Sequence, residues 1–121
     1  MTDPQSNSQP DRLTTEHHTT DGVRIVTAHG EIDNSVTDLF SQALQPEAGA
    51  LSPRIVADLS GITFMDSSGI NVLITAHRHV SEAQGWLRIA GAQPSVERLL
   101  QLVGVDTVIS CHPTVQQALH H

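Results

Sequence analysis

The sequence predicts a single α/β domain with one mixed β-sheet of about five strands and about four helices, in the order ββαβαβαβα. Its length of 121 residues fits one domain with one core. Short apolar runs alternate with segments of helical periodicity, and strands separated by helices favour parallel pairing through right-handed crossovers. Aromatic residues make up only 2% of the chain, so Val, Ile, Leu and Ala must fill the interior.

Residues 1–12 predict a flexible tail, because two prolines and mainly polar side chains offer too little apolar surface to offset the entropy of ordering them. The domain is expected to span residues 13–121. Residues 13–20 are polar and predict an edge strand, and Asp21-Gly22 is a turn that favours positive φ. Residues 23–30 complete the hairpin, which is the one pair that must be antiparallel.

The next two elements are a helix and a buried strand. Asn34 or Ser35 can cap a helix whose apolar residues recur at spacings of three and four, and Pro46 ends it. Residues 54–59 form a short apolar run with β-branched side chains. Such a run predicts a strand inside a sheet that is covered on both faces.

The strongest helical pattern follows the stretch FMDSSG at residues 64–69, and Gly85 is expected to end that helix in a left-handed conformation. Residues 86–90 return as a strand. A further helix is opened by Pro94 and closed by Gly104. The remaining expected elements are a short strand at residues 107–109 and a terminal helix at residues 113–121.

The FMDSSG stretch places two hydroxyls beside a carboxylate at the point where a strand leads into a helix. In α/β sheets functional surfaces usually lie at such points. Three explanations compete for these side chains: a helix cap formed by Asp66 or Ser67, a catalytic serine, and a hydroxyl that accepts a phosphate.

The cap needs only one of these polar side chains, which leaves the others free for another role. A serine hydrolase typically shows Gly-x-Ser-x-Gly, whereas the chain has Met-Asp-Ser-Ser-Gly and no histidine that the sequence alone brings to Ser67. A Walker A phosphate loop is also absent from the sequence. A phosphoserine at a helix N-terminus would be stabilised by nearby N–H dipoles, whereas a protein docked over the same turn would be repelled.

Composition narrows the classes of partner. The formal net charge of −7 repels phosphate backbones and anionic membranes, so neither nucleic acid nor membrane is expected as a partner. Cys111 is the single cysteine, which excludes an internal disulfide and fits a reducing compartment. The chain shows no signal-peptide pattern and no run of about 18 apolar residues, so a cytoplasmic protein is expected.

Neither a cofactor nor a metal is expected. No cluster with metal-ligand spacing emerges from the sequence. His77 and His79 lie two residues apart on a predicted helix, a spacing that points them away from each other. They are interpreted as part of a solvated helix face.

Two motifs resemble the STAS-domain family, specifically its bacterial anti-sigma factor antagonists. The longer is VADLSGITFMDSSGINVL at residues 56–73, which resembles that family's Asp-Leu-Ser and Phe-Met-Asp-Ser-Ser/Thr-Gly signature. The shorter is Gly-Glu-Ile-Asp at residues 30–33, similar to the family's Gly-Glu-Leu-Asp. The resemblance covers roughly residues 13–119, and the two motifs together are more specific than either alone.

The resemblance implies a STAS fold and partner switching by a protein that is not an enzyme. In the family, the unphosphorylated antagonist binds an anti-sigma factor that is also a serine kinase and thereby frees a sigma factor. Phosphorylation ends that association, and a serine phosphatase reverses it. By motif matching Ser67 is the phosphoacceptor, and a monomer or weak dimer is expected. The residues expected to contact the partner are Asp33, Thr63, Met65, Asp66 and Ser68.

Each of these residues also has a structural interpretation. Asp33 could cap the first helix together with its neighbours, and Thr63 and Met65 could pack on the sheet. An alternative function is a STAS scaffold that is never phosphorylated and binds a small ligand or a transport complex. A hydrolase is the third hypothesis.

Overall fold

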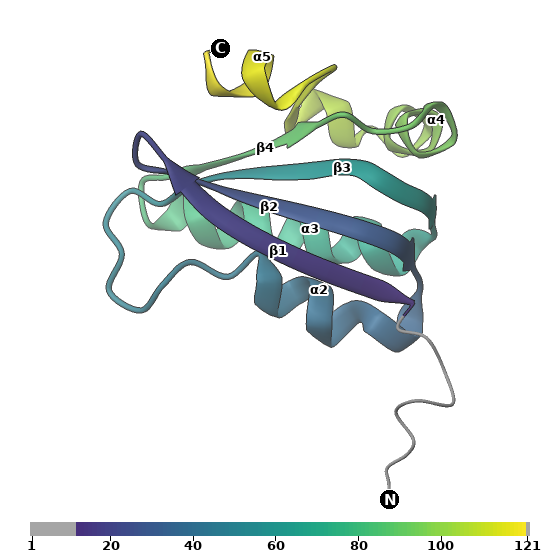
Figure 1. Ribbon diagram of the computed structural model, residues 1–121, viewed down its shortest axis with the longest axis horizontal. Coiled ribbons are helices and arrows are strands. Elements are labelled where there is room, and N and C mark those ends of the chain that lie inside the picture. Colours follow the sequence, from purple (N-terminus) through teal and green to yellow (C-terminus); the bar gives the residue numbers. More distant parts are fainter. Residues whose placement is uncertain (1–11, 121) are drawn as a thin grey trace, which may run out of the picture.

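The computed structural model describes residues 12–120 and contains one five-stranded sheet in the order β1-β2-β3-β4-β5 (Figure 1). The antiparallel hairpin consists of β1 (Leu13–Thr20) and β2 (Val23–Ile32). The strands β3 (Arg54–Met65), β4 (Trp86–Ala90) and β5 (Ser110–His112) then add in parallel. The predicted mixed α/β sheet with one antiparallel pair is therefore confirmed. Residues 1–11, most of the predicted tail, and His121 lie outside the described part of the chain.

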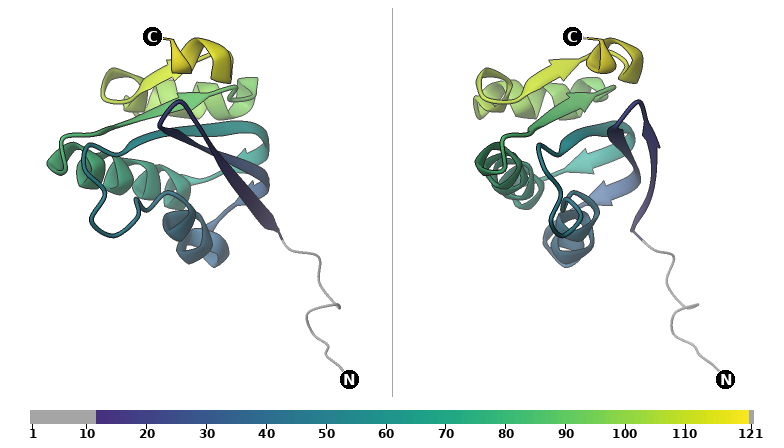
Figure 2. Two further views of the ribbon diagram at one scale, coloured as in Figure 1. Left: turned by 60° about the vertical axis from the view of Figure 1, so that its left-hand side comes forward. Right: turned by 90° about the vertical axis from the view of Figure 1, so that its left-hand side faces the viewer.

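Helices cover both faces of the sheet. Figure 1 shows α2 (Thr37–Ala43) and α3 (Ser67–Glu82) on one side, and α4 (Pro94–Leu102) and α5 (Val115–Leu119) on the other. Figure 2 shows the same layers from two further directions. The larger core cluster joins α2, α3 and α4 to the sheet, and a smaller one places Ala118 of α5 against β2, β3 and β4. Burial on both faces explains why β2, β3 and β4 are rich in Val, Ile and Leu.

The opening hairpin folds as its turn residues predict. Asp21 and Gly22 both have positive φ, 52° and 80°, as a two-residue turn of type I′ requires. The register then runs without interruption from Thr20↔Val23 to Leu13↔Gly30. One consequence is that residue 12, just before β1, lies beside residue 31 on β2.

Three elements differ in their bounds from the sequence prediction, the first of them because of long-range pairing. β3 continues to Met65 instead of ending at residue 59, since its second half pairs with residues 29–32 of β2. The last strand is Ser110–His112, because residues 105–107 form the 3-10 helix η2 (Val105–Thr107). The terminal helix is likewise shorter than predicted and is capped by Thr114.

The predicted left-handed residue at Gly85 is wrong. Gln84 takes that conformation, with φ of 68°, and ends α3. Gly85 is required for a different reason, because a Cβ at this position would overlap the backbone carbonyl of Pro53. The glycine therefore allows two backbone segments to approach each other closely.

Candidate functional site

The candidate site lies where β2 and β3 end side by side. Ile32 and Met65 are register partners, and the Asp66 N–H donates to the Ile32 carbonyl oxygen at 3.1 Å. Because parallel strands end at the same edge of the sheet, the residues that follow them are neighbours. Asp33 and the turn that carries Ser67 therefore lie next to each other.

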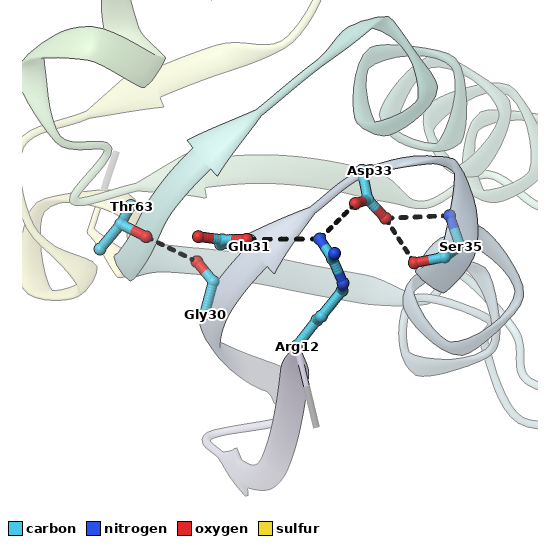
Figure 3. Close-up of polar contacts among 6 residues, drawn as sticks. All are labelled: Arg12, Gly30, Glu31, Asp33, Ser35 and Thr63. Carbon is cyan, nitrogen blue, oxygen red and sulfur yellow. Dashed lines mark hydrogen bonds and ion pairs between the residues drawn. The ribbon is translucent and has the colours of Figure 1, made fainter. Parts of the chain in front are cut away.

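Asp33 caps the 3-10 helix η1 (Asn34–Val36), which leads into α2. One carboxylate oxygen accepts from the Ser35 N–H at 2.9 Å and from the Ser35 hydroxyl at 2.6 Å. The other pairs with the Arg12 guanidinium at 2.7 Å (Figure 3). The pKa of Asp33 is lowered from its ordinary value of 3.8, chiefly by the Ser35 hydroxyl, then by the Ser35 N–H, with a smaller effect of Arg12. The structural role considered for Asp33, a helix cap, is therefore confirmed, whereas neither Asn34 nor Ser35 is the cap; the 3-10 helix begins at Asn34 and α2 follows at Thr37.

Arg12 is part of this site, although its place in the sequence predicted that it belongs to the tail. Its guanidinium reaches Glu31 at 3.5 Å as well as Asp33. The hairpin register positions it, and the Glu31 N–H donates to the Arg12 carbonyl oxygen at 2.8 Å. The signal that could have found Arg12 is that register, since pairing Leu13 with Gly30 places residue 12 beside residue 31.

Asp66 caps α3 in the same manner. Its backbone is extended, and its carboxylate accepts from the Ser68 N–H at 2.8 Å. Asp66 was one of the two predicted cap residues and is confirmed as the cap. Ser67, the other candidate, is the first residue of the helix and is exposed, whereas Ser68 is half-buried. The cap does not use the Ser67 hydroxyl, which leaves that group accessible from solvent.

The remaining predicted contact residues divide between surface and interior. Thr63 is exposed and its hydroxyl donates to the Gly30 carbonyl oxygen at 3.3 Å (Figure 3). Met65 is only 6% exposed and belongs to the core, so of its two predicted roles it packs on the sheet. Phe64, between them, is 48% exposed and was not singled out from the sequence. The register explains its exposure: Gly30↔Ile62 is followed by Glu31↔Phe64, so Thr63 is an extra residue in a bulge, and Thr63 and Phe64 are both exposed between the buried Ile62 and Met65.

A polar groove of about 230 Å³ runs beside the turn, between α2 and α3. None of its lining side chains is charged. They are Asn34, Thr37, Ser41, Ser68, Asn71, Val72 and Thr75. The groove thus continues the surface of the turn with neutral hydrogen-bonding groups.

The described residues lack two further features, a metal-binding cluster and a membrane-spanning helix. Residues 12–120 contain no group of three or more His, Cys, Asp and Glu side chains placed to hold a metal ion. None of the helices in that range is long and apolar enough to cross a membrane.

The thiol of Cys111 is half-buried. Its burial, with smaller effects of Asp106 and Glu97, raises its pKa to about 11. The thiol therefore remains protonated at neutral pH.

Comparison with known proteins identifies the family. The STAS domain profile matches residues 14–118. An anti-sigma F factor antagonist of Paenibacillus polymyxa is 30% identical over 108 residues, covering 86% of this chain and 88% of its own. The crystal structure of an anti-sigma factor antagonist from Mycobacterium paratuberculosis has 30% identity and a TM-score of 0.79, covering 93% and 95% of the two chains.

A third similar structure is that of the Bacillus cell fate determinant SpoIIAA in the phosphorylated form. Its identity is 20% and its TM-score 0.62, with 88% of this chain and 97% of that chain covered. At this identity the similarity establishes the fold alone. The profile and the two relatives at 30% identity show that this chain belongs to the STAS domain family, among its anti-sigma factor antagonists.

Proposed function

We propose that this protein, when unphosphorylated, binds an anti-sigma factor that is also a serine kinase and frees a sigma factor, and that phosphorylation of Ser67 ends the association. The observation that carries the proposal is the position of Ser67, exposed at the start of α3 and next to the end of β2 that bears Asp33. The names of the relatives support the general role.

The proposed transfer joins the Ser67 hydroxyl oxygen to the γ-phosphorus of the ATP held by the kinase. The bond from that phosphorus to the β,γ-bridging oxygen breaks, ADP leaves, and the hydroxyl proton passes to a base of the kinase or to water. A serine phosphatase reverses the step with water as nucleophile and releases inorganic phosphate. In this scheme the antagonist supplies an acceptor and no catalytic group. Because ATP is needed, the cytoplasm is the proposed compartment.

The phosphorylated domain is expected to stay folded. Asp66 caps α3 through the Ser68 N–H, so modification of the neighbouring hydroxyl removes no cap. The phosphate would stand at the N-terminus of a 16-residue helix, where the backbone N–H groups and the helix dipole favour an anion. The charge therefore acts on the partner and leaves the fold intact.

The same charge would eject a docked protein. The carboxylates of Glu31, Asp33 and Asp66 already lie around the turn, and the guanidinium of Arg12 is engaged by the first two. Phosphorylation adds about two negative charges to this surface. A loss of about 3 kcal/mol in binding free energy is enough to weaken the complex roughly a hundredfold.

We propose a docking surface centred on Ser67. Asp33, Asp66, Thr63 and Ser68 surround the turn, with the neutral α2–α3 groove on one side. Phe64 supplies an exposed aromatic side chain next to it, of the kind that anchors protein interfaces. Met65 is expected to support this docking surface indirectly, by packing beneath the turn. Ser67 is preferred over Ser68 as the acceptor because Ser68 is half-buried.

The direct test is phosphorylation by the cognate kinase with ATP. Mass spectrometry should find one phosphate, located on Ser67, and Ser67→Ala should abolish it. Ser81→Ala is the control, since it removes an exposed hydroxyl near the other end of α3 and should leave labelling unchanged. A phosphate located on any other residue contradicts the assignment.

The second test measures binding of the kinase. Ser67→Glu should weaken the complex roughly a hundredfold. Ser81→Glu, the same change at an exposed position near the other end of α3, should have little effect. A complex that tolerates Ser67→Glu would instead support a STAS scaffold that is not switched by phosphate.

A further inference from the structure

The outer edge of β1 has no neighbouring strand within residues 12–120, and a single acidic side chain, Glu16, is its main protection. Natural edge strands are commonly short, or carry charged side chains, proline or a bulge that prevents pairing with another chain. β5, at the opposite edge, is only three residues long. β1 is eight residues long, contains neither proline nor lysine, and pairs with β2 in an unbroken register.

The side chains of β1 alternate between the two faces of the sheet. Glu16 and His18 lie opposite Thr27 and Ile25, and Ile25 belongs to the smaller core cluster near α5. His17 lies opposite Val26, which belongs to the larger core cluster. Glu16, His17 and His18 are all exposed, so their side chains are available to a strand added at this edge.

A second copy can add only in certain registers. Two identical antiparallel edge strands are related by a two-fold axis perpendicular to the sheet, which keeps equivalent faces on the same side. Residues directly opposite each other must then lie on the same face. The axis therefore lies level with one residue of β1, midway between the two copies of that residue. Each choice of residue gives a different set of pairs.

Among the three registers centred in the middle of β1, charge favours one. An axis through His17 places Glu16 opposite His18 of the second copy, and the same pair forms again on the other side of the axis. An axis through Glu16 would instead place two carboxylates opposite each other, and an axis through His18 would leave Glu16 opposite Thr20. Opposite charges or hydrogen-bonding partners across strands stabilise a pair, whereas like charges destabilise it.

We propose that β1 is a homodimerisation edge, which joins two copies by antiparallel pairing about His17 and merges two five-stranded sheets into one. The partner is a second copy of this chain, recognised by backbone hydrogen bonds and by the reciprocal Glu16–His18 pairs. The Leu13 end of β1 lies near the Asp33 site, and antiparallel pairing sends the two copies of that end in opposite directions. Both switch surfaces therefore stay open, and the dimer does not depend on the proposed phosphorylation.

The first experiment is sedimentation equilibrium of the full chain from micromolar to millimolar concentration. The wild type should dimerise reversibly. His18→Glu, which sets two pairs of carboxylates against each other, should weaken dimerisation about tenfold or more. The exchange Glu16→His with His18→Glu should restore it, and Glu97→His, an exposed acid on α4, should have no effect. A chain that is monomeric throughout, a dimer indifferent to His18→Glu, or an exchange that fails to restore dimerisation would each overturn the proposal.

The second experiment tests the register by cross-linking in a Cys111→Ser background. His17→Cys lies on the proposed axis, where facing Cβ atoms of paired strands are about 4.5–5.5 Å apart, and should form an intermolecular disulfide under mild oxidation. Thr19→Cys is the matched control on the same face, because the axis places Thr15 and not Thr19 opposite it. Cross-linking of Thr19→Cys in preference to His17→Cys would rule out this register. Circular dichroism verifies that each variant is folded.

Discussion

Two neighbouring helix starts in this molecule have nearly the same sequence, Asp-Asn-Ser at residues 33–35 and Asp-Ser-Ser at residues 66–68. In both, the carboxylate accepts from the N–H two residues further on, at 2.9 and 2.8 Å. At the first, the Ser35 hydroxyl and Arg12 also bind the carboxylate. At the second, the residue after the cap is Ser67, where the first has Asn34.

The comparison separates what the fold needs from what a switch needs. Each cap works through its aspartate, so the next residue is free to vary. At the first cap that residue is an amide, which cannot accept a phosphate as a hydroxyl does. At the second it is an exposed hydroxyl. The two caps thus serve as controls for each other, because the residue after the cap is an amide at the first and a hydroxyl at the second.

The largest effect is expected from exchanging the two residues, Asn34→Ser with Ser67→Asn. Both caps keep their aspartates, so the fold should survive. Phosphate transfer should fall more than about a hundredfold, because a hydroxyl displaced from its productive position loses the alignment that transfer requires. Labelling with the cognate kinase and ATP, followed by peptide mapping, measures it. Efficient labelling at position 34 of the exchanged protein would mean that the kinase recognises the Asp-x-Ser turn and not its place in the fold.

The third helical residue also differs between the caps, Val36 at the first and Gly69 at the second. A Cβ on Gly69 would lie 2.6 Å from Met65 Cγ and 2.9 Å from Ile32 Cγ2. Gly69→Ala should therefore lower the free energy of unfolding by about 1–3 kcal/mol, although alanine is the better helix former. Urea denaturation measures the loss, with Asn71→Ala on the exposed part of α3 as the control. A variant as stable as the wild type would show that Met65 and Ile32 move aside without strain.

A smaller effect is expected at the second cap itself. Asp66→Ala removes the acceptor for the Ser68 N–H and should destabilise the protein by about 1 kcal/mol. Asp66→Asn keeps an acceptor oxygen and should lose much less. Thermal unfolding of the two variants against wild type distinguishes them, and equal losses would mean that the charge and not the hydrogen bond stabilises α3.

Local pattern was enough to predict most of the fold. The hairpin, the strand at residues 86–90 and the helix opened by Pro94 follow from turn residues and periodicity, and all are confirmed. The errors arose where distant segments decide the outcome. The second half of β3 is a strand because β2 pairs with it, and Gly85 is required by Pro53, which lies before β3 in the chain.

The candidate site was predicted unevenly for the same reason. The Asp66 cap and the exposed Ser67 follow from a strand that leads into a helix, a local signal. Arg12 was missed because its partners are 19 and 21 residues away, across the hairpin. Met65 could not be placed inside or outside from the sequence, because its side depends on the bulge at Thr63, which arises from the pairing of β3 with β2.

The smallest effect is expected in the titration of Asp33, the aspartate of the first cap. Because the pKa of Asp33 lies below 3.8, its contribution to stability is present above that pH and is lost as the pH falls through the folded-state pKa. Side-chain carboxyl NMR should find the midpoint below 3.8 in the wild type. Ser35→Ala should raise it more than Arg12→Ala, because the hydroxyl is the largest cause of the shift and the exposed ion pair with Arg12 is screened by solvent. High salt should remove only the Arg12 part. If Arg12→Ala raised the midpoint more than Ser35→Ala, the first cap would be held by its ion pair and not by its hydrogen bonds.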